Sequence, residues 1–172
     1  MEARLMDAVS EQRLQKVHPL LAEKIRAMAS QLMAEGIPIR VTQGLRTWEE
    51  QEDLYRQGRN GDTRPIVTNA PPGFSFHQFG LAVDCVPMTD KGPDWNITHP
   101  VWQRMIAVGQ SLGLTSGATW RSFPDAPHFQ YTGILSATPT NQVRQAYQTG
   151  GIQAVWTMAG MPHPYTSSEI NA

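Results

Sequence analysis

The sequence is poor in cysteine and in charge. A single cysteine, Cys85, stands among 172 residues, so no intramolecular disulfide can form and a small disulfide-stapled fold is excluded. Charged residues make up 17% of the chain, below the roughly 25% of an ordinary domain. The formal net charge is -1, and because nucleic-acid binders carry a basic excess, we expect no nucleic-acid partner.

The chain also lacks a long apolar run. Charged residues such as Glu2, Arg4 and Asp7 interrupt the N-terminus, so the apolar core of a signal peptide is missing. The most apolar late stretch, residues 151–161, has about half the length that a membrane-spanning helix needs. We therefore expect a protein made in the cytoplasm without a signal peptide and without membrane insertion. Its access to any substrate outside the cell then depends on another factor.

What the sequence does contain is an ordinary apolar share together with many loop-forming residues. Apolar residues are 40% of the chain, and glycine and proline number 14 and 13. This length suits a single domain over residues 1–172 better than two domains. The composition predicts a compact fold with long ordered loops.

Hydrophobic periodicity and capping signals predict the order of the elements. Leu21, Ile25 and Met28 recur at helical spacing, whereas Ile37, Ile39 and Val41 alternate as in a half-buried strand. Helices and strands do not alternate regularly, which favours an α+β fold with a small, mainly antiparallel sheet flanked by helices. The expected helices are residues 3–16, 18–35, 47–58, 98–113, 141–148 and 152–159. The expected strands are residues 37–42 and 80–86 with another within 120–131, and residues 59–76 form a long loop.

Two clusters of polar residues point to a metal site. Asp84 lies within an apolar strand, where an ionised carboxylate is costly unless a cation or strong donors meet it. His77 precedes it in a loop, and His128 shares one face of a later strand with Gln130. Two histidines and one carboxylate form a three-ligand zinc set with a fourth position open for water. Asp125, close to His128, could serve as a general base for that water.

Each of these residues alone is weak support. A single histidine is more often packed or exposed than a ligand, and an aspartate in a strand often pairs with arginine or lysine. His18 and His99 each precede a proline at a helix start, so we expect them to cap helices or face solvent. Cys85 alternates away from Asp84 and is expected to be a small buried residue. Spacing alone therefore predicts a bare metal site of two histidines and one aspartate.

The arrangement of these residues resembles the zinc peptidases of bacterial cell walls. That family contains D-alanyl-D-alanine carboxypeptidases and the L-alanyl-D-glutamate endopeptidases used as phage endolysins. The similarity covers roughly residues 14–131 of the chain. It is carried by Ser75-x-His77-x-x-Gly80-x-Ala82-x-Asp84, by Asp125-x-Pro127-His128-Phe129, and upstream by Gln43-Gly44-Leu45-Arg46-Thr47 and Gln51.

This resemblance implies a role for most of the candidate residues. It implies one zinc ion per chain held by His77, Asp84 and His128, with Asp125 as the catalytic base. It also implies that Arg46 steadies the tetrahedral intermediate or a substrate carboxylate. The implied fold is the small mixed sheet shared by the D,D-peptidases and the Hedgehog signalling domain. The catalytic core would then span about residues 14–132, with residues 133–172 as a C-terminal helical extension.

Four further residues are expected to line or support the site. We expect Ser75, Gln51 and Trp120 to contact substrate, and Gln130 to help orient a metal ligand. Two alternatives stay open: Ser75 could merely shape its loop, and Trp120 could belong to the core.

The predicted function is that of a zinc endopeptidase that cuts the L-Ala–D-Glu bond of peptidoglycan stem peptides. We expect a monomeric phage or prophage lysis enzyme that reaches the wall through a holin-type pore. A D-alanyl-D-alanine carboxypeptidase of the same fold is the main alternative, because it uses the same metal chemistry. A catalytically silent wall-binding module that keeps zinc for stability is the less favoured one.

Overall fold

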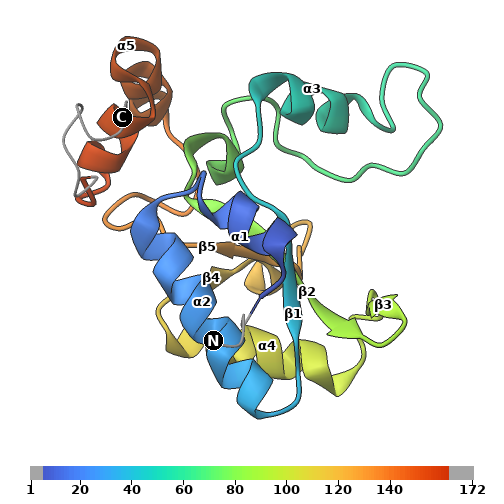
Figure 1. Cartoon of the computed structure of the whole chain (residues 1–172). Coiled ribbons are helices and arrows are strands. Elements are labelled where there is room, and N and C mark those ends of the chain that lie inside the picture. The colour runs from blue at the N-terminus through green and yellow to red at the C-terminus, as the bar shows by residue number, and fades with distance from the viewer. Residues whose placement is uncertain (1–5, 163–172) are drawn as a thin grey trace.

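The computed structural model describes residues 6–162 (Figure 1). The α-helices are α1 (Ala8–Leu14), α2 (Pro19–Ala34), α3 (Trp48–Arg56), α4 (Pro100–Ser111) and α5 (Asn141–Met158). The strands are β1 (Ile39–Gln43), β2 (Ala82–Thr89), β3 (Gly92–Pro93), β4 (Thr115–Ser116) and β5 (His128–Gln130). Two short 3-10 helices, η1 (Phe76–Phe79) and η2 (Gly117–Thr119), complete the described elements.

The strands form one small sheet in the order β1-β2-β5-β4, with β3 paired to the far end of β2. Every pairing between these strands is antiparallel. The predicted α+β class with a small antiparallel sheet is therefore confirmed. Asp84 on β2 and His128 on β5 are direct register partners, so two of the predicted ligands lie side by side on neighbouring strands.

The main core lies between the sheet and helices α2 and α4, and Figure 1 shows α2 crossing in front of the sheet. The sheet contributes Val83, Cys85 and Phe129 to this core, each fully buried. Because side chains alternate along a strand, Asp84 and His128 point to the opposite face. The site therefore occupies the face of the sheet that α2 and α4 leave free.

A second apolar cluster joins α5 to η1. It is made of buried residues from both elements and from the start of β2: Phe76, Phe79, Leu81, Ala82, Val143, Val155, Trp156, Ala159 and Met161. Gly151 interrupts α5 with a φ of 70° and a ψ of -163°, which agrees with the two short helices predicted there. This cluster holds η1, and the loop before it, against the sheet.

Several predicted boundaries differ from the observed ones. The first helix begins at Ala8, where Asp7 caps it, and residues 3–5 of the predicted helix lie outside the described part of the chain. β2 continues to Thr89, and η1, β3 and β4 were not predicted. These three elements span only two to four residues each, which is too short for local periodicity to give a signal.

The expectation that His18 caps a helix is confirmed. It caps α2 by accepting a hydrogen bond from Leu20 N–H at Nδ1, yet its side chain is fully buried and does not face solvent. Its Nε2 lies 2.5 Å from the Met161 carbonyl oxygen, and its ring packs edge-on against Trp156. Trp156 and Met161 therefore cover a capping residue whose burial the sequence did not indicate.

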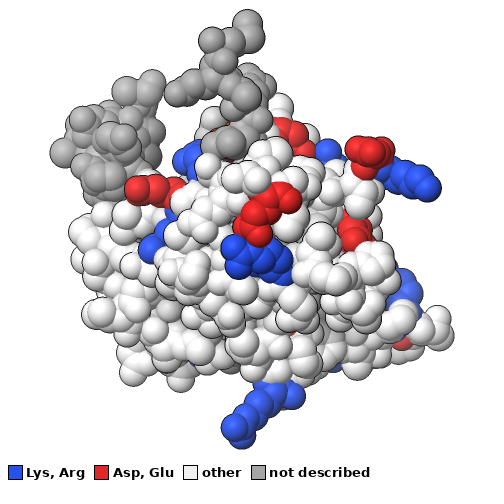
Figure 2. All heavy atoms as spheres, turned by 90° about the horizontal axis from the view of Figure 1, so that it is seen from below, with Lys and Arg blue, Asp and Glu red and all other residues white. Residues whose placement is uncertain are grey.

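The surface carries no concentration of charge on the face shown in Figure 2, where lysine, arginine, aspartate and glutamate are scattered among uncharged residues. Within residues 6–162, none of the helices combines the length and the hydropathy required to cross a bilayer.

Candidate metal centre and active site

A bulge in β1 precedes the segment that carries Arg46 to the site. Val41 pairs with Cys85, but Gln43 pairs with Asp84, so the register shifts by one residue at Thr42. Such bulges bend a strand and re-aim the side chains that follow. Here the bulge directly precedes the segment of residues 44–46, and Arg46 lies beside Asp84.

The short helix η1 positions His77. Ser75 caps its N-terminus and accepts a hydrogen bond from His77 N–H. Gly80 ends it with a φ of 66° and a ψ of 26°, a left-handed conformation that glycine adopts without steric cost. This sharp end lets the chain enter β2 directly, and the His77 ring folds back toward Asp84.

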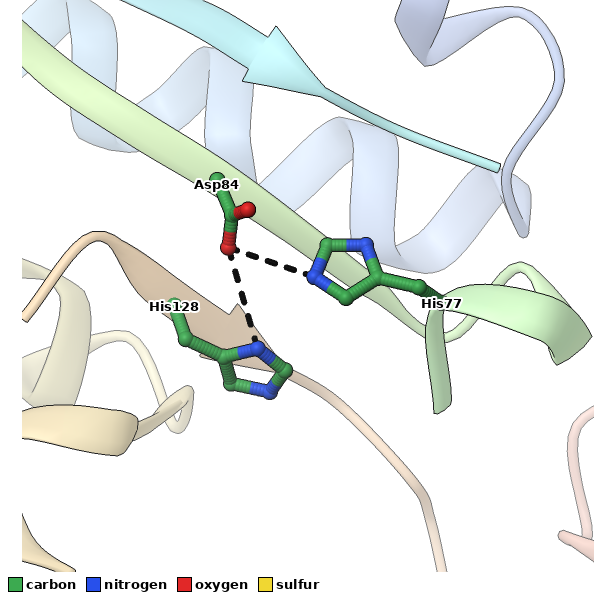
Figure 3. Close-up of side chains that lie close together, drawn as sticks. All are labelled: His77, Asp84 and His128. Atoms are coloured by element: carbon green, nitrogen blue, oxygen red, sulfur yellow. Dashed lines mark hydrogen bonds and ion pairs between the residues drawn. The ribbon is translucent and has the colours of Figure 1, made fainter. Parts of the chain in front are cut away.

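Figure 3 shows that both imidazole rings are directed at the Asp84 carboxylate. His77 Nε2 lies 3.2 Å from Asp84 Oδ1, and His128 Nδ1 lies 3.7 Å from the same oxygen. One ligand atom from each residue lies within 4.8 Å of the other two. Tetrahedral zinc with ordinary bond lengths separates its ligand atoms by about 3.4 Å. The three side chains therefore fit a zinc ion in their donor chemistry and in their spacing.

Hydrogen bonds on the far side of each ring leave the inward nitrogen free for a metal. His77 Nδ1 lies 2.9 Å from the Gly44 carbonyl oxygen, which can only accept, so Nδ1 carries the proton and Nε2 presents its lone pair. Gln130 donates its amide N–H to the Ala137 carbonyl, so its Oε1 faces His128 Nε2 at 2.8 Å. His128 Nε2 therefore carries the proton, and Nδ1 presents its lone pair toward Asp84.

The protonation of the site also suits a cation. Burial raises the pKa of Asp84, but the two imidazoles and Arg46 outweigh this effect and bring it to about 2. Burial, together with the neighbouring His77, lowers the pKa of His128 to about 4. At neutral pH the aspartate is therefore ionised and His128 is neutral, which are the forms that bind metal.

Asp125 stands at the rim of this cluster. Its Oδ2 lies 3.9 Å from His128 Nδ1, and its side chain is 40% exposed. Partial burial, with the negative charge of Asp84 close by, raises the pKa of Asp125 to about 6. Its N–H donates to the Gly117 carbonyl at 2.9 Å. A Cβ atom on Gly117 would lie only 2.5 Å from the Asp125 carbonyl oxygen, so only glycine allows this close approach.

Arg46 lies on the other side of Asp84, with Nη2 at 3.5 Å from Asp84 Oδ2. Its side chain is only 10% exposed. Burial lowers the pKa of Arg46, and the carboxylates of Asp84 and Asp125 partly offset this effect. An arginine guanidinium nevertheless stays protonated in proteins, so a fixed positive charge borders the site.

The remaining predicted residues lie around this centre in different ways. Trp120 is half-buried, and its ring centroid lies 4.7 Å from that of His128, so it forms one wall of the site. Ser75 is half-buried and shapes η1 through its capping bond. Gln51 is fully buried behind Arg46, so the structure gives it no surface to offer a substrate.

Three residues that support the site received no role from the sequence, although Gln43 belongs to the upstream motif. Gln78 on η1 contacts Gln51, Gln43 accepts a hydrogen bond from Arg46 Nε, and Gly117 packs against Asp125. The only sequence signal for Gln78 was its position as a polar residue between His77 and Phe79. Both of these neighbours are buried, but only the folded structure shows their burial.

A comparison with protein families decides the class of this protein. Residues 14–134 match the VanY family, the D-alanyl-D-alanine carboxypeptidases. The chain belongs to this family. The family resemblance and the D,D-peptidase-like fold predicted from the sequence are thereby confirmed.

Individual proteins similar to this chain are peptidoglycan peptidases. The peptidoglycan L-alanyl-D-glutamate endopeptidase CwlK of Bacillus subtilis is 30% identical over 122 residues, which are 66% of this chain and 72% of CwlK. The structure of the Serratia marcescens L-Ala D-Glu endopeptidase ChiX matches with a TM-score of 0.56 and 28% identity, covering 73% of this chain and 87% of ChiX. The LD-carboxypeptidase LdcB is only 20% identical, with a TM-score of 0.54 over 87% of this chain and 79% of its own, and shares the fold. The VanY-family protein described here is thus a peptidase that acts on peptidoglycan.

Proposed function

We propose that this VanY-family peptidase is a zinc-dependent endopeptidase that hydrolyses the L-Ala–D-Glu bond of peptidoglycan stem peptides. The observation that carries the proposal is the His77–Asp84–His128 cluster, whose two inward nitrogens both present lone pairs toward one carboxylate oxygen. The two relatives that carry an L-Ala–D-Glu endopeptidase name, at 30% and 28% identity, support the choice of bond.

His77 Nε2, Asp84 Oδ1 and His128 Nδ1 would hold the zinc ion, one per chain. When bound, zinc supplies a Lewis acid that polarises the scissile carbonyl and lowers the pKa of water to about 7. The Gly44 carbonyl and the Gln130 amide keep the two rings oriented for this role. These hydrogen bonds are already formed in the protein without substrate, so the two rings are oriented before a substrate binds.

Asp125 is the residue that moves the proton. Its carboxylate faces the space in front of His128, and its pKa of about 6 leaves it mainly ionised at neutral pH yet able to hold a proton. We infer that it takes a proton from the attacking water and delivers it to the departing amine of the cleaved peptide bond. Positioned acid-base groups of this kind contribute about 10²–10⁴-fold in rate.

Arg46 supplies fixed positive charge. Because it is buried beside Asp84, its guanidinium acts in a site with little water to screen it. We infer that it stabilises the negative charge that develops on the carbonyl oxygen as water adds. Trp120, which packs on His128, and Ser75, at the start of η1, are then placed to contact the stem peptide.

The cleaved bond is tested directly by digesting purified peptidoglycan with the zinc-loaded protein and identifying the new ends by mass spectrometry. The proposal expects fragments ending in L-Ala and new N-termini on D-Glu. Release of D-alanine alone would reject the endopeptidase and establish the carboxypeptidase alternative. Removing zinc with a chelator should abolish cleavage, and adding zinc back should restore it. Cleavage that persists after complete removal would contradict zinc dependence.

The biological setting that we propose is bacteriolysis by a monomeric phage-type endolysin released through a holin-type pore. Expression in a bacterial host with and without a co-expressed holin tests this setting, because lysis should require both proteins. A sedimented wall fraction that retains the protein without any cleavage, at saturating zinc, would instead establish the silent wall-binding module.

A further inference from the structure

We propose that Gln51 and Gln78 are positioning residues for Arg46: two buried amides that hold its guanidinium in place without neutralising its charge. The inference rests on the proposed function of Arg46 in peptide hydrolysis. Gln51 was expected from the sequence to contact substrate, and Gln78 had no expected role.

Gln51 forms the central contact. Its side chain is fully buried on α3, and its Nε2 donates to the Ala70 carbonyl at 2.7 Å. This bond fixes the amide, so Oε1 must face the other way. There it accepts from Arg46 Nη1 at 2.8 Å and from Gln78 Nε2 at 3.0 Å. Both of the amide's polar atoms are therefore used inside the protein.

Gln78 holds Gln51 in turn. Its side chain is 2% exposed, and its Oε1 accepts from the backbone N–H groups of Gly73 and Ser75 at 3.1 and 3.2 Å. Its Nε2 is thereby directed at Gln51. The two amides thus connect the backbone of residues 70–75, just before His77, to the guanidinium of Arg46.

The partners of the Arg46 guanidinium are uncharged amides. Arg46 donates from Nε to Gln43 Oε1 at 2.9 Å and from Nη1 to Gln51 Oε1. Both acceptors are neutral amide oxygens, whereas the carboxylate of Asp84 lies farther from the guanidinium, at 3.5 Å from Nη2. A carboxylate at position 51 would form a close ion pair and cancel much of the field of the arginine. An amide fixes the direction of the guanidinium and leaves its charge available to the reacting carbonyl.

The position of the Arg46 guanidinium is therefore coupled, through the two amides, to the backbone of residues 70–75. Loss of the Gln51 amide removes the acceptor at Nη1 and leaves the guanidinium held only by Gln43 at Nε and by the longer contact to Asp84, so the group can shift. The three candidate metal ligands should stay in place, because Gln51 contacts none of them. Displacements of about 1 Å at a catalytic group can cost about 10²-fold in rate. Gln51 variants should therefore lower kcat through Arg46, with zinc content unchanged.

The test is a double-mutant cycle on the zinc-loaded full chain. Gln51→Asn shortens the amide and Gln51→Met removes it, and each should lower kcat at least 10-fold, with KM for a stem-peptide substrate changing less than 3-fold. In an Arg46→Ala background, the same changes should lower kcat less than 2-fold further. Gln145→Met, at an exposed position of α5, is the matched control and should behave as wild type. An equal fall in both backgrounds, or an unchanged kcat in both Gln51 variants, overturns the inference.

A second measurement keeps the inference testable independently of turnover. In ¹H–¹⁵N spectra, the buried Arg46 Nη1–H group, which donates to Gln51 Oε1, should give an exchange-protected signal in the wild type and lose that protection in Gln51→Asn. Unchanged protection overturns the positioning role even if the protein proves to cleave no wall substrate. Conversely, a wild type that fails to cleave while protection is lost as expected would reject the proposed function and keep the contact. Gln78→Met should reproduce the Gln51 effects if Gln51→Met does not fold.

Discussion

Gln130 Oε1 lies 2.8 Å from Nε2 of His128, and the amide nitrogen of Gln130 is held by the Ala137 carbonyl. This contact favours one tautomer of His128, a proposed metal ligand, from outside the proposed metal site. Gln130→Leu keeps the volume but removes the acceptor, so the His128 ring loses its orientation. We expect zinc affinity to fall about 10–100-fold, measured by competition with a chromophoric chelator. Gln103→Leu, at an exposed position of α4, should leave the affinity unchanged, and equal affinities for both variants would contradict the role of Gln130.

Asp125→Ala separates proton transfer from metal binding. Asp125 approaches His128 Nδ1 only to 3.9 Å and does not belong to the group of three converging ligands. The variant should keep one zinc per chain and lose about 10²–10⁴-fold in kcat. Metal analysis and turnover are measured on the same sample. Loss of zinc from this variant would show that Asp125 is a ligand and that its assignment as the base is wrong.

Asp84→Asn tests the metal centre itself. Asp84 Oδ1 is the atom that both imidazoles face, and an amide oxygen is a much weaker zinc ligand than a carboxylate. The variant should bind little zinc. Since a ligand that binds only the folded state raises stability, zinc should raise the Tm of the wild type and leave that of the variant unchanged. Asp90→Asn, on the exposed surface, is the control, and a zinc-dependent Tm shift in Asp84→Asn would refute the ligand assignment.

Gly117→Ala tests the packing beneath the base. The added Cβ would meet the Asp125 carbonyl oxygen at 2.5 Å and His128 Cβ at 2.9 Å, distances that force the 117–125 segment to move. We expect at least a 10-fold fall in kcat, because the base and one ligand shift together. Ala118→Ser, at the next position, serves as the control. Wild-type turnover in Gly117→Ala would mean that the segment relaxes without displacing Asp125.

Asp7→Ala probes stability away from the site. Asp7 caps α1 by accepting from Ser10 N–H at 2.8 Å and pairs with Arg40 at 2.6 Å. Burial raises the pKa of Asp7, but the bonds from Ser10 and Arg40 outweigh it and leave the pKa below its usual 3.8. Because this pair is more than one-third exposed, we expect only about 1 kcal/mol of lost unfolding free energy at pH 7.

The loss of unfolding free energy in Asp7→Ala should depend on pH, because the pKa of Asp7 is lowered in the folded protein. A carboxyl group with a lowered pKa stabilises the folded protein above its unfolded pKa, and the stabilisation disappears as pH falls through the folded value. The difference between wild type and Asp7→Ala should therefore be full above about pH 4 and shrink below it. Urea unfolding at pH 7 and pH 3 measures it, with the exposed Asp53→Ala as control. A difference that grows at pH 3 would contradict the assignment.

The elements were predictable where the signal is local. The helix after Pro19, the cap at Thr47 and the interruption of the last helix at Gly151 all follow from residues within a few positions of one another. Such effects act through the backbone of a single turn, and they need no knowledge of the fold. The metal-ligand candidates were predictable too, because their residue types and motifs are unusual enough to stand out.

The fate of polar residues was not predictable in the same way. His18 and Gln51 look like surface or substrate-facing residues in the sequence, yet both are fully buried. Their partners, the Met161 carbonyl for one and Arg46 with Gln78 for the other, come from other parts of the chain. A polar side chain can be buried only where such partners meet it, and only the folded chain specifies where they are.

The sequence by itself indicated the α+β class of this protein and its candidate metal ligands, because helix periodicity, caps and donor chemistry reside in short stretches of residues. The tertiary structure decided whether those ligands meet. It did so through the antiparallel register that sets Asp84 beside His128, the ion pair that sets Arg46 beside Asp84, and the hydrogen bonds that select one nitrogen of each ring. These relationships depend on contacts between residues far apart in the chain, and packing of the whole domain is what creates them.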